Sequence, residues 1–375
     1  MAFQFQSVAA VAPLLGQEFG VSIADIGMLI GLYFAPGIIF ALPGGAVGQK
    51  FGDKRTVLAA LAVMLAGSVA MAYATSWNIQ IAGRLVAGIG GVILSVQLTK
   101  MLTDWFAGKE IATAMAILVN SWPAGIAVSL LTLPMIGTGG GLGAVHLAVA
   151  AFIAFGIVLL ALFYQPPADA PAVSAGKGRL DRRTALAVMV AGMIWGLFNI
   201  AFAIIFSFGP TMLVERGWSI ASGGSAISIV LWLAVFSVPF GGFLADRTKR
   251  PQTIMVVTCV VAALLMIWLP RSGMVIATVV ALGLVGGQPA GPIMSLPARV
   301  LQPATRAVGM GLFFATYYGC MMLGPVIGGA LAKWTGSAAA AFDFGAAMAL
   351  ACPVLLLAFN RITGEATARR AAAST

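Results

Sequence analysis

Long apolar stretches recur along the whole of this chain, and they constrain its fold more than any other feature. Each stretch holds about 18 to 25 residues, and about 20 apolar residues suffice to cross the hydrocarbon core of a bilayer. Hydrophobic residues make up 61% of the 375 residues and charged residues only 9%, whereas soluble domains contain roughly 25% charged residues. Most of the chain is therefore expected to be surrounded by lipid.

The apolar stretches favour helices over the strands of a membrane barrel. Inside hydrocarbon each backbone amide must find a partner within its own helix or within a closed barrel, and barrel strands alternate in polarity, which these runs do not. The predicted spans are 2–16, 25–47, 56–74, 79–101, 111–136, 144–164, 185–208, 225–245, 252–269, 274–297, 310–334 and 343–359. The predicted fold class is thus an all-α integral membrane protein with twelve transmembrane helices.

Basic residues gather on one side of the predicted membrane. The chain holds 21 Lys and Arg against 11 Asp and Glu, a net charge of +10. If the amino end is cytoplasmic, every Lys and Arg lies in an inner loop or tail except Arg84, Arg216, Arg271 and Lys333. Because cytoplasmic loops of membrane proteins are enriched in basic residues, we expect both termini to be cytoplasmic. The charge then indicates topology and contact with anionic lipid, not a nucleic-acid partner.

The chain contains an internal repeat. Residues 13–24 match residues 210–221 at a constant offset of 197, with six of twelve positions identical. Parallel repeats of six helices, with the substrate path at their interface, are one architecture of membrane transporters. The predicted units are an N-terminal six-helix bundle at 1–164, a cytoplasmic linker at 165–184, and a C-terminal six-helix bundle with a short cytoplasmic tail at 185–375.

The repeat also predicts that the first helix is incomplete. The seventh span begins near Ala185, and subtracting the offset of 197 gives a position before Met1. We therefore expect the sequence to have lost its cytoplasmic start, through a downstream start codon or a truncation. The absent part could carry an acidic residue.

Two inner loops with glycines and basic residues occupy equivalent places in the halves. The first reads GAVGQKFGDKR at 45–55, and the second reads GFLADRTKR at 242–250. The offset of 197 carries Gly45 onto Gly242 and Lys50 onto Arg247. These loops resemble the inner-loop signature of the major facilitator superfamily, roughly Gly-x-Leu-x-Asp-Arg-x-Gly-x-Arg-Arg. The resemblance covers essentially the whole chain and implies two pseudo-symmetric six-helix bundles.

The resemblance also implies a conformational role for these loops. Glycines let helices approach closely, and a charged turn can form contacts that differ between transporter states. The first copy departs from the signature, because Gln49 stands where the family usually has an acid, whereas Asp246 keeps it. The alternative is that the loops are only the basic loops expected on the cytoplasmic side. The residues concerned are Gly45, Gln49, Lys50, Gly52, Arg55, Gly242, Asp246, Arg247 and Arg250.

Arg84 is the one charged residue well inside a predicted span. It lies in GRLVAGIGG at 83–91, which resembles the superfamily's helix 4 motif with its embedded arginine. An ionisable residue within the membrane is by default a candidate for function. The alternative is that its side chain snorkels to the nearby interface.

A glycine-proline tract lies in the predicted span 310–334, which is helix 11. The sequence GPVIGG at 324–329 resembles the Gly-Pro-x-x-Gly-Gly signature that antiporters carry in helix 5, but it lies in the other half. Helix 5 has NSWPAG at 120–125 instead. The tract therefore does not identify an antiporter.

Polar and aromatic residues near the span centres form the candidate substrate cavity. Transporter sites lie near the midplane, often where Gly or Pro interrupts a helix, and helix 10 has GGQPAGP at 286–292. The alternatives are a packing kink in helix 10 and, for any single aromatic residue, ordinary core packing. The candidates are Arg84, Gln6, Tyr33, Asn120, Trp122, Trp195, Asn199, Gln288, Tyr317 and Tyr318, with Gln4 and Trp232 as further mid-span residues.

The charge content of the spans favours one class of solute. No Asp or Glu falls deep within a predicted span. Embedded carboxylates are the usual proton relays and the partners of cationic substrates, so a cavity with Arg84 and no acid favours an anionic or neutral polar solute. We expect a secondary transporter that moves such a solute by alternating access.

Within the superfamily, Tyr33-x-x-Pro36-Gly37 and the segment 105–110 resemble the bacterial cyanate and nitroimidazole transporter-like group and its organic-anion relatives. That resemblance implies a bacterial inner membrane. A proton-coupled efflux antiporter for drugs or metabolites is the main alternative, and a sensor that binds a ligand without moving it is a third.

The chain offers little material for catalysis or metal binding. Cys259, Cys320 and Cys352 show no paired or metal-ligand spacing, and His146 is the only histidine. We therefore expect a protein that is not an enzyme and has no cofactor and no metal. The expected partners are a small-molecule substrate and the lipid bilayer, with a coupling proton or a counter-transported anion as a further candidate. We expect the chain to be a monomer.

Overall fold

The computed structural model describes residues 1–40, 51–106, 111–165, 180–302 and 305–373, and all regular structure in these ranges is helical. The first part of the chain forms α1 (Ala2–Ala10), α2 (Ala12–Phe19), α3 (Ile23–Leu32), α4 (Ala35–Phe40), α6 (Asp53–Ala72), α7 (Trp77–Phe106) and α8 (Ile111–Phe163). The second part forms α9 (Arg182–Glu215), α10 (Ile220–Thr248), α11 (Pro251–Trp268), η1 (Leu269–Arg271), α12 (Val275–Gly286), α13 (Ala290–Met294), η2 (Pro297–Arg299), α14 (Arg306–Thr335) and α15 (Ala339–Ala373). The all-α prediction is confirmed.

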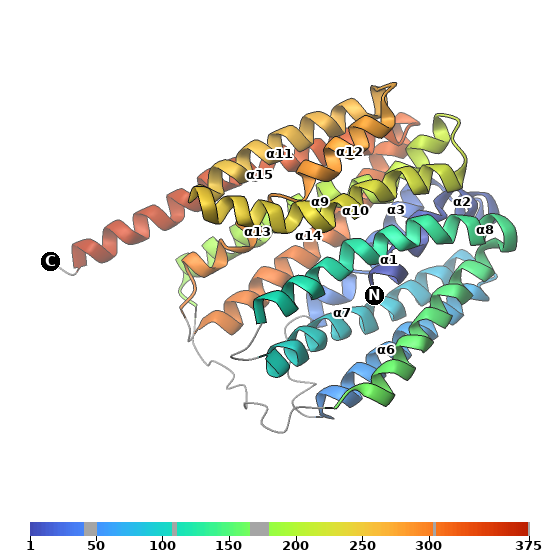
Figure 1. The fold of residues 1–375 in the computed structure, drawn as a ribbon, viewed down its shortest axis with the longest axis horizontal. Coiled ribbons are helices and arrows are strands. Elements are labelled where there is room, and N and C mark those ends of the chain that lie inside the picture. Colours follow the sequence, from blue (N-terminus) through green and yellow to red (C-terminus); the bar gives the residue numbers. More distant parts are fainter. Residues whose placement is uncertain (41–50, 107–110, 166–179, 303–304, 374–375) are drawn as a thin grey trace.

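The helices account for the twelve predicted spans. Ten segments in the described part of the chain are long and apolar enough to cross a membrane. One of them, Ile117–Phe163, holds two spans, because α8 reverses at Gly141, where φ is 75°. Figure 1 shows the hairpin that this reversal creates. The remaining span consists of α1 and α2, which have 9 and 8 residues and are individually too short to count among the ten.

Several observed boundaries differ from the predicted ones. The first span is not one helix, because Val11, with φ −122° and ψ 24°, separates α1 from α2. The span predicted at 25–47 is divided between α3 and α4 just before Pro36, because proline has no amide hydrogen to donate to the preceding turn. Residues 41–47 of that prediction lie outside the described residues.

The two halves repeat the same turns at the offset of 197. Gly20 and Gly217 both have positive φ, 63° and 87°. Each turn leads into a capped helix, because the hydroxyl of Ser22 accepts from the amide of Asp25 and that of Ser219 accepts from the amide of Ser222. These turns agree with a fold of two pseudo-symmetric bundles. The boundaries of the bundles stay predictions, and linker residues 166–179 lie outside the described residues.

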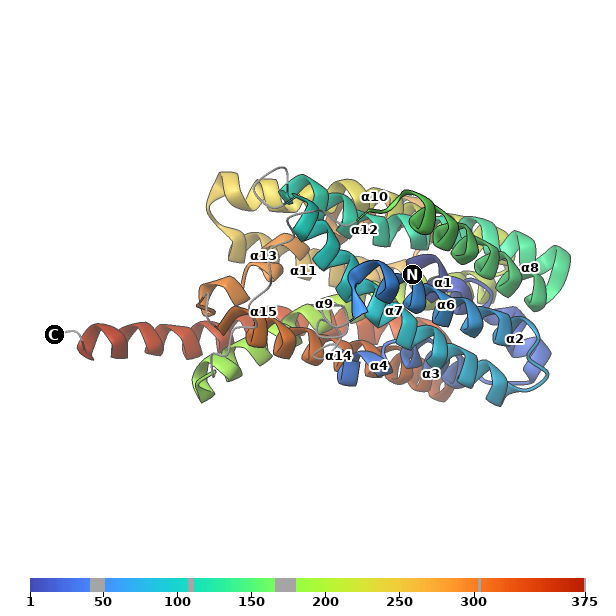
Figure 2. The same ribbon diagram turned by 90° about the horizontal axis from the view of Figure 1, so that it is seen from below.

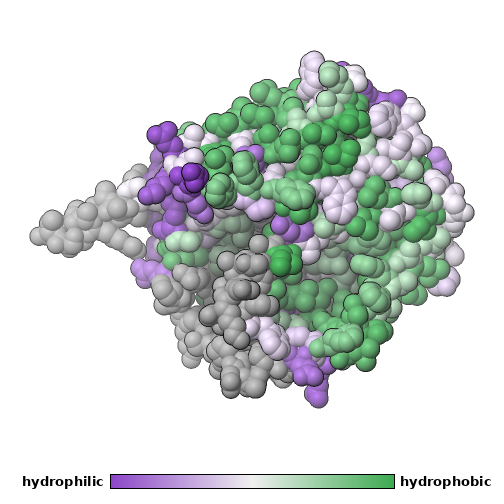
Figure 3. Space-filling model, in the orientation of Figure 1, coloured by the Kyte–Doolittle hydropathy of each residue, from purple (hydrophilic) through white to green (hydrophobic). Residues whose placement is uncertain are grey.

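The bundle has two distinct ends. We call the end where α6 begins and α10 ends the basic end, because Lys54, Lys100, Arg250 and Arg299 lie there. The end with the turns at Gly20, Gly141 and Gly217 is the opposite end. Figures 1 and 2 show α15 projecting from the basic end, and Figure 3 shows hydrophilic residues gathered there beside a largely apolar flank.

At the opposite end the halves touch through small residues. Helix α3 packs on α14, and Gly27 and Gly31 lie so close to the carbonyl oxygens of Pro325 and Met322 that a Cβ would overlap them. Helix α8 packs on α10, where a Cβ on Gly224 would lie 2.5 Å from the carbonyl oxygen of Leu130. Because small residues permit such close approach, the halves are in direct backbone contact at this end.

Candidate substrate site

Aromatic side chains from both halves meet where the halves join. Phe5 on α1 and Phe34, between α3 and α4, have ring centroids 4.9 Å apart. Phe5 contacts Phe206 of α9 edge-on at 6.0 Å, and Phe34 contacts Tyr317 of α14 at 6.4 Å. Tilted and edge-on contacts at these separations are favourable. Aromatic rings therefore connect the halves at this level.

These contacts continue along α9 and close into a circuit. Phe206, Phe202 and Phe198 follow at four-residue spacing, with centroids 6.0 and 6.3 Å apart. Phe198 lies 5.6 Å from Trp195, which lies 6.2 Å from Tyr317. We call this closed set the aromatic circuit, and its members are Phe5, Phe34, Tyr317, Trp195, Phe198, Phe202 and Phe206.

Four of the predicted cavity residues lie at the aromatic circuit. Trp195 and Tyr317 belong to it, Trp122 of α8 stacks on Phe5 at 5.8 Å, and Tyr318 lies 6.1 Å from Phe34. Tyr318 is buried, whereas Trp122, Trp195 and Tyr317 are half-buried. The three half-buried side chains are thus the ones that a solute could contact.

Two predicted amides lie on the same helices as these rings. Asn199, one turn from Trp195, donates from Nδ2 to the carbonyl oxygen of Trp195 at 2.7 Å and is half-buried. Asn120 precedes Trp122 by two residues, and its Oδ1 is buried without a hydrogen-bond partner among the described residues. Since buried polar atoms are normally paired, Asn120 offers an acceptor to a hydroxyl or to water.

Arg84 is completely buried behind the aromatic circuit. Its Nε donates to the carbonyl oxygen of Leu29 at 3.0 Å, Nη1 to that of Gln4 at 3.1 Å, and Nη2 to that of Phe5 at 2.7 Å. The guanidinium carbon lies 4.6 Å from the ring centroid of Tyr33. With 0% exposure, Arg84 does not snorkel to the interface. Each of its three nitrogens is engaged by the protein.

A buried polar network surrounds this arginine. The hydroxyl of Tyr33 donates to Oε1 of Gln4 at 3.2 Å, and Nε2 of Gln4 donates to Ser68 at 2.7 Å and to the carbonyl oxygen of Met64 at 2.8 Å. Tyr33 has no exposed surface. The predicted cavity residue Tyr33 therefore holds α1 and α3 in place around Arg84.

Gln6 connects the two halves directly. Its Nε2 donates to the carbonyl oxygen of Phe206 at 2.7 Å across the interface of α1 and α9. Its Oε1 is buried with no hydrogen-bond partner in the described part of the chain. The side chain of Gln6 thus contacts the aromatic circuit at the backbone of Phe206.

The span predicted at 274–297 is interrupted as predicted, and Gln288 lies in the interruption. Helix α12 ends at Gly286 and α13 begins at Ala290. Between them, Gln288 donates from Nε2 to the carbonyl oxygen of Leu284 at 2.9 Å, and its backbone packs on Gly241 of α10. These contacts agree with a packing kink, and a role for Gln288 in the substrate cavity stays a prediction. Trp232, also on α10, is 40% exposed.

The first inner loop is described only in part. Gly45, Gln49 and Lys50 lie outside the described residues. Gly52 precedes α6 with φ 83° and ψ 143°, a conformation that favours glycine. Arg55 is exposed. The conformational role of these residues stays a prediction.

Two neighbours of that loop make contacts that sequence reasoning missed. Asp53 forms an ion pair of 2.6 Å with Lys100 at the end of α7. Lys54 donates from Nζ to the carbonyl oxygens of Ala161 and Tyr164 at 2.8 Å each. A cation at a helix C-terminus is favourable, so this lysine ties the start of α6 to the end of α8.

The second inner loop is exposed. Asp246, Arg247 and Arg250 form no ion pair with one another or with any other described residue. Gly242 allows close packing, because a Cβ on Gly291 of α13 would lie 3.2 Å from its Cα. A change in the contacts of this loop between states is likewise still a prediction.

The chain matches the family described as Major Facilitator Superfamily over residues 1–320 and 185–374. It belongs to the major facilitator superfamily. Among its relatives, the hexuronate transporter of Bacillus subtilis strain 168 is 23% identical over 309 residues, which are 74% of this chain and 71% of the relative. The inner membrane transport protein YajR of Escherichia coli K12 is 25% identical over 66% of this chain and 56% of its own length. The probable nitrate transporter NarT of Staphylococcus carnosus is 22% identical over 66% and 64%.

Solved structures of this superfamily architecture agree with the fold. The nucleoside transporter NupG superposes with a TM-score of 0.73 at 14% identity, covering 96% of this chain and 98% of the other. A structure from work on proton dependent oligopeptide transporters superposes with a TM-score of 0.73 at 14% identity. It covers 97% of this chain and 96% of the other. The family and the relatives indicate a multi-pass membrane transporter. The fold class and the superfamily resemblance are confirmed.

Part of the aromatic circuit was not predicted from the sequence. Phe198, Phe202 and Phe206 recur at four-residue spacing, which places them on one face of a helix, and this signal was visible. Phe5 and Phe34 carried no comparable signal, because an isolated phenylalanine in an apolar span is indistinguishable from a core residue.

Proposed function

We propose that this superfamily member moves a small anionic or neutral polar solute by alternating access and binds it at the aromatic circuit. The observation that carries the proposal is the circuit itself, which draws on helices of both halves. Its half-buried members and neighbours, Trp122, Trp195 and Tyr317, would contact the solute. A site shared by two bundles changes whenever the bundles rock against each other, which is how such transporters couple binding to access.

The buried charge supports a preference for anions. Arg84 donates to the carbonyl oxygen of Phe5, so its charge is in direct contact with a member of the circuit. No carboxylate among the described residues pairs with it. A unit charge acting over about 8 Å at an effective dielectric constant near 20 contributes about 2 kcal/mol. In this proposal Arg84 acts through its electric field and by positioning α1, since each of its three nitrogens already donates to a backbone carbonyl oxygen.

The relatives also support a preference for anions. Hexuronate and nitrate, named for two of them, are both anions. In a bacterial inner membrane with both termini cytoplasmic, the basic end would face the cytoplasm. The contacts of Gly27, Gly31 and Gly224 would then close the outer side, and the described conformation would be closed to the outside.

Uptake into proteoliposomes containing the purified full chain tests this proposal. The panel holds glucuronate, nitrate, a neutral nucleoside and a cationic dye, each measured with and without a proton gradient. Saturable uptake of an anion or neutral polar solute is expected, with a loss of at least tenfold in Trp195→Ala. The matched control is Trp268→Ala, because Trp268 is 59% exposed and lies outside the circuit. Uptake of the dye alone would contradict the proposal.

A proton-coupled efflux antiporter is the second candidate, favoured by the apolar character of the circuit. Five of its seven members are phenylalanines, and apolar cavities suit drug-like molecules. Azole resistance protein 1 of Saccharomyces cerevisiae is 33% identical over 90 residues, which are 24% of this chain and 14% of the relative. An inward proton gradient that drives dye out of the vesicles, with no anion uptake, would favour this candidate.

A further inference from the structure

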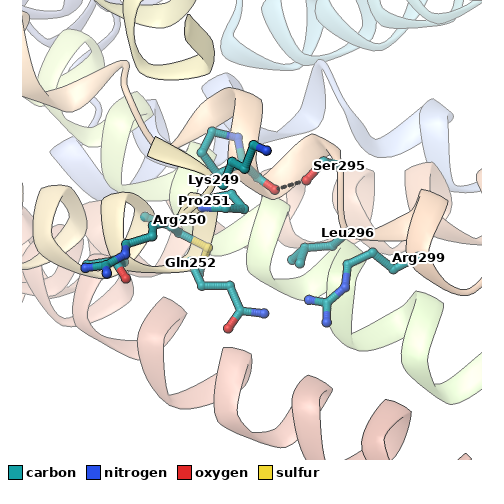
Figure 4. Close-up of a pocket in the computed structure, with 10 residues that line it drawn as sticks. Lys249, Arg250, Pro251, Gln252, Ser295, Leu296 and Arg299 are labelled. Carbon is teal, nitrogen blue, oxygen red and sulfur yellow. Dashed lines mark hydrogen bonds between the residues drawn. The ribbon is translucent and has the colours of Figure 1, made fainter. Parts of the chain in front are cut away.

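A separate cavity lies at the basic end and shares no lining residue with the aromatic circuit. It has a volume of about 380 Å³ and is formed by the α10–α11 turn, the start of α11 and residues between Pro292 and Arg299. Lys249, Arg250 and Arg299 line it, and none of its ten lining residues is acidic. Figure 4 shows Gln252 and Arg299 turned toward the same space, with Lys249 above them.

The internal repeat shows that this charge pattern is a departure from the first half. The offset of 197 places Arg250 on Asp53 and Lys249 on Gly52. In the first half, Asp53 forms an ion pair with Lys100. In the second half the acid is replaced by arginine, so this cavity gathers cations where the first half has a pair. Like charges repel, and an anion bound between them would relieve that repulsion.

The backbone of the turn adds to the positive potential. Lys249 has φ 54° and is the one non-glycine residue with positive φ in the described part of the chain. That conformation is unfavourable for lysine, and Gly52 holds the equivalent position. Helix α11, of 18 residues, begins at Pro251, with Arg250 as its N-cap residue. Its unpaired amides place a partial positive charge at the same cavity.

Two side chains of the cavity are held in place from α15. Gln252 and Asn360 exchange hydrogen bonds of 3.0 and 3.1 Å. Arg299 lies over the ring of Phe359 at 5.5 Å, and its Nη1 lies 3.5 Å from Oδ1 of Asn360. These contacts fix Gln252 and Arg299 before any ligand arrives, and a fixed guanidinium beside an amide suits the oxygens of a phosphate group.

We propose that this cavity binds a phosphate group, carried by the headgroup of an anionic lipid or by a soluble phosphate ester. Clusters of basic residues at a membrane surface attract anionic lipid, and the volume suits a headgroup. The inference does not depend on which solute the transporter moves.

Native mass spectrometry of the purified full chain tests the proposal, with phosphatidylglycerol, phosphatidylcholine or inorganic phosphate as the probe. Each basic residue near the headgroup is expected to contribute about fivefold to binding, so Arg250→Gln/Arg299→Gln should bind phosphatidylglycerol about 30-fold more weakly. Lys249→Gly is a second variant that leaves both arginines in place and should lose about fivefold. The charge-matched control is Arg182→Gln/Arg361→Gln, because both arginines are exposed and neither lines the cavity.

The outcomes separate the two sources of phosphate. A lipid headgroup is supported if the cavity variants, but not the control, lose binding of phosphatidylglycerol, and if millimolar phosphate does not displace this lipid from the wild-type protein. Displacement by phosphate, together with thermal stabilisation by phosphate that the double variant lacks, supports a soluble ester. Equal binding by wild type and both cavity variants, or an equal loss in the control, would overturn the proposal.

Discussion

Nη2 of Arg84 donates a 2.7 Å hydrogen bond to the carbonyl oxygen of Phe5, so a fully buried charge lies directly behind a ring that joins the two halves. The same guanidinium also binds the backbone of Gln4 and Leu29. Arg84 holds α1 against α3, and in the proposed function it also makes the site electropositive. Variants can distinguish these two effects.

Arg84→Met should be strongly destabilising, because it removes the three hydrogen bonds that Arg84 donates to buried carbonyl oxygens. We expect a loss of about 3 kcal/mol in the free energy of unfolding. Arg84→Lys keeps the charge but lacks the planar fork that reaches three acceptors, so it should lose less and keep the preference for anions. Thermal unfolding in detergent and the ratio of anion to neutral uptake measure the two effects. Wild-type stability in Arg84→Met would contradict the structural role.

Gly27→Leu should prevent closure of the opposite end. Any side chain at Gly27 would overlap the carbonyl oxygen of Pro325, so α3 and α14 must separate there. With Tyr317→Cys as the reporter and the three native cysteines replaced by alanine, labelling by a membrane-impermeant maleimide from that side should become at least tenfold faster. Gly156→Leu is the control, because a Cβ there meets no atom within 4 Å. Equal labelling rates in both variants would count against this closure.

Asp53→Asn should lower stability by about 1 kcal/mol, because it breaks the ion pair with Lys100. The side chains of the pair are 22% and 16% exposed, whereas those of Arg271 and Asp343 are 50% and 44% exposed. Salt screens exposed pairs more strongly, so Asp343→Asn should have a smaller effect that disappears at high salt. Thermal unfolding across ionic strength checks this order, and the reverse order would contradict it.

The residues Gly52 and Lys249 should respond oppositely to substitution. Gly52→Ala places a Cβ at φ 83° and ψ 143° and should be destabilising by about 2 kcal/mol. Lys249→Gly relieves a lysine held at φ 54° and should stabilise the lipid-free protein by up to about 1 kcal/mol. Chemical denaturation in detergent measures both. If Lys249→Gly were destabilised instead, the contacts of the Lys249 side chain would contribute more to stability than the strain of its backbone costs.

The fold was largely predictable because lipid imposes simple demands. Span length and the need to pair every amide within a helix identified the helices, and the offset between residues 13–24 and 210–221 identified the repeat. The spans predicted at 111–136 and 144–164 also bracket the reversal at Gly141. The break at Val11 was missed, because it depends on the backbone at a single residue, and apolar composition carries little information about that.

The candidate site was only partly predictable. Trp122, Trp195 and Tyr317 were named from their depth in the span, and the structure places them at the aromatic circuit. Arg84 was expected to face the cavity, whereas the structure buries it against backbone carbonyl oxygens. Depth can be estimated from a sequence, but the direction in which a side chain points depends on contacts between helices that are distant along the chain.

Spin-label distances in the two ends of the transporter test alternating access most directly. One label pair at Glu18 and Lys333 spans the halves at the opposite end, and a second pair at Leu162 and Thr248 spans them at the basic end; all four positions are exposed. In lipid nanodiscs, a transported anion should lengthen one distance and shorten the other within the same population. Two distances that stay fixed under every solute that the protein transports would contradict the account.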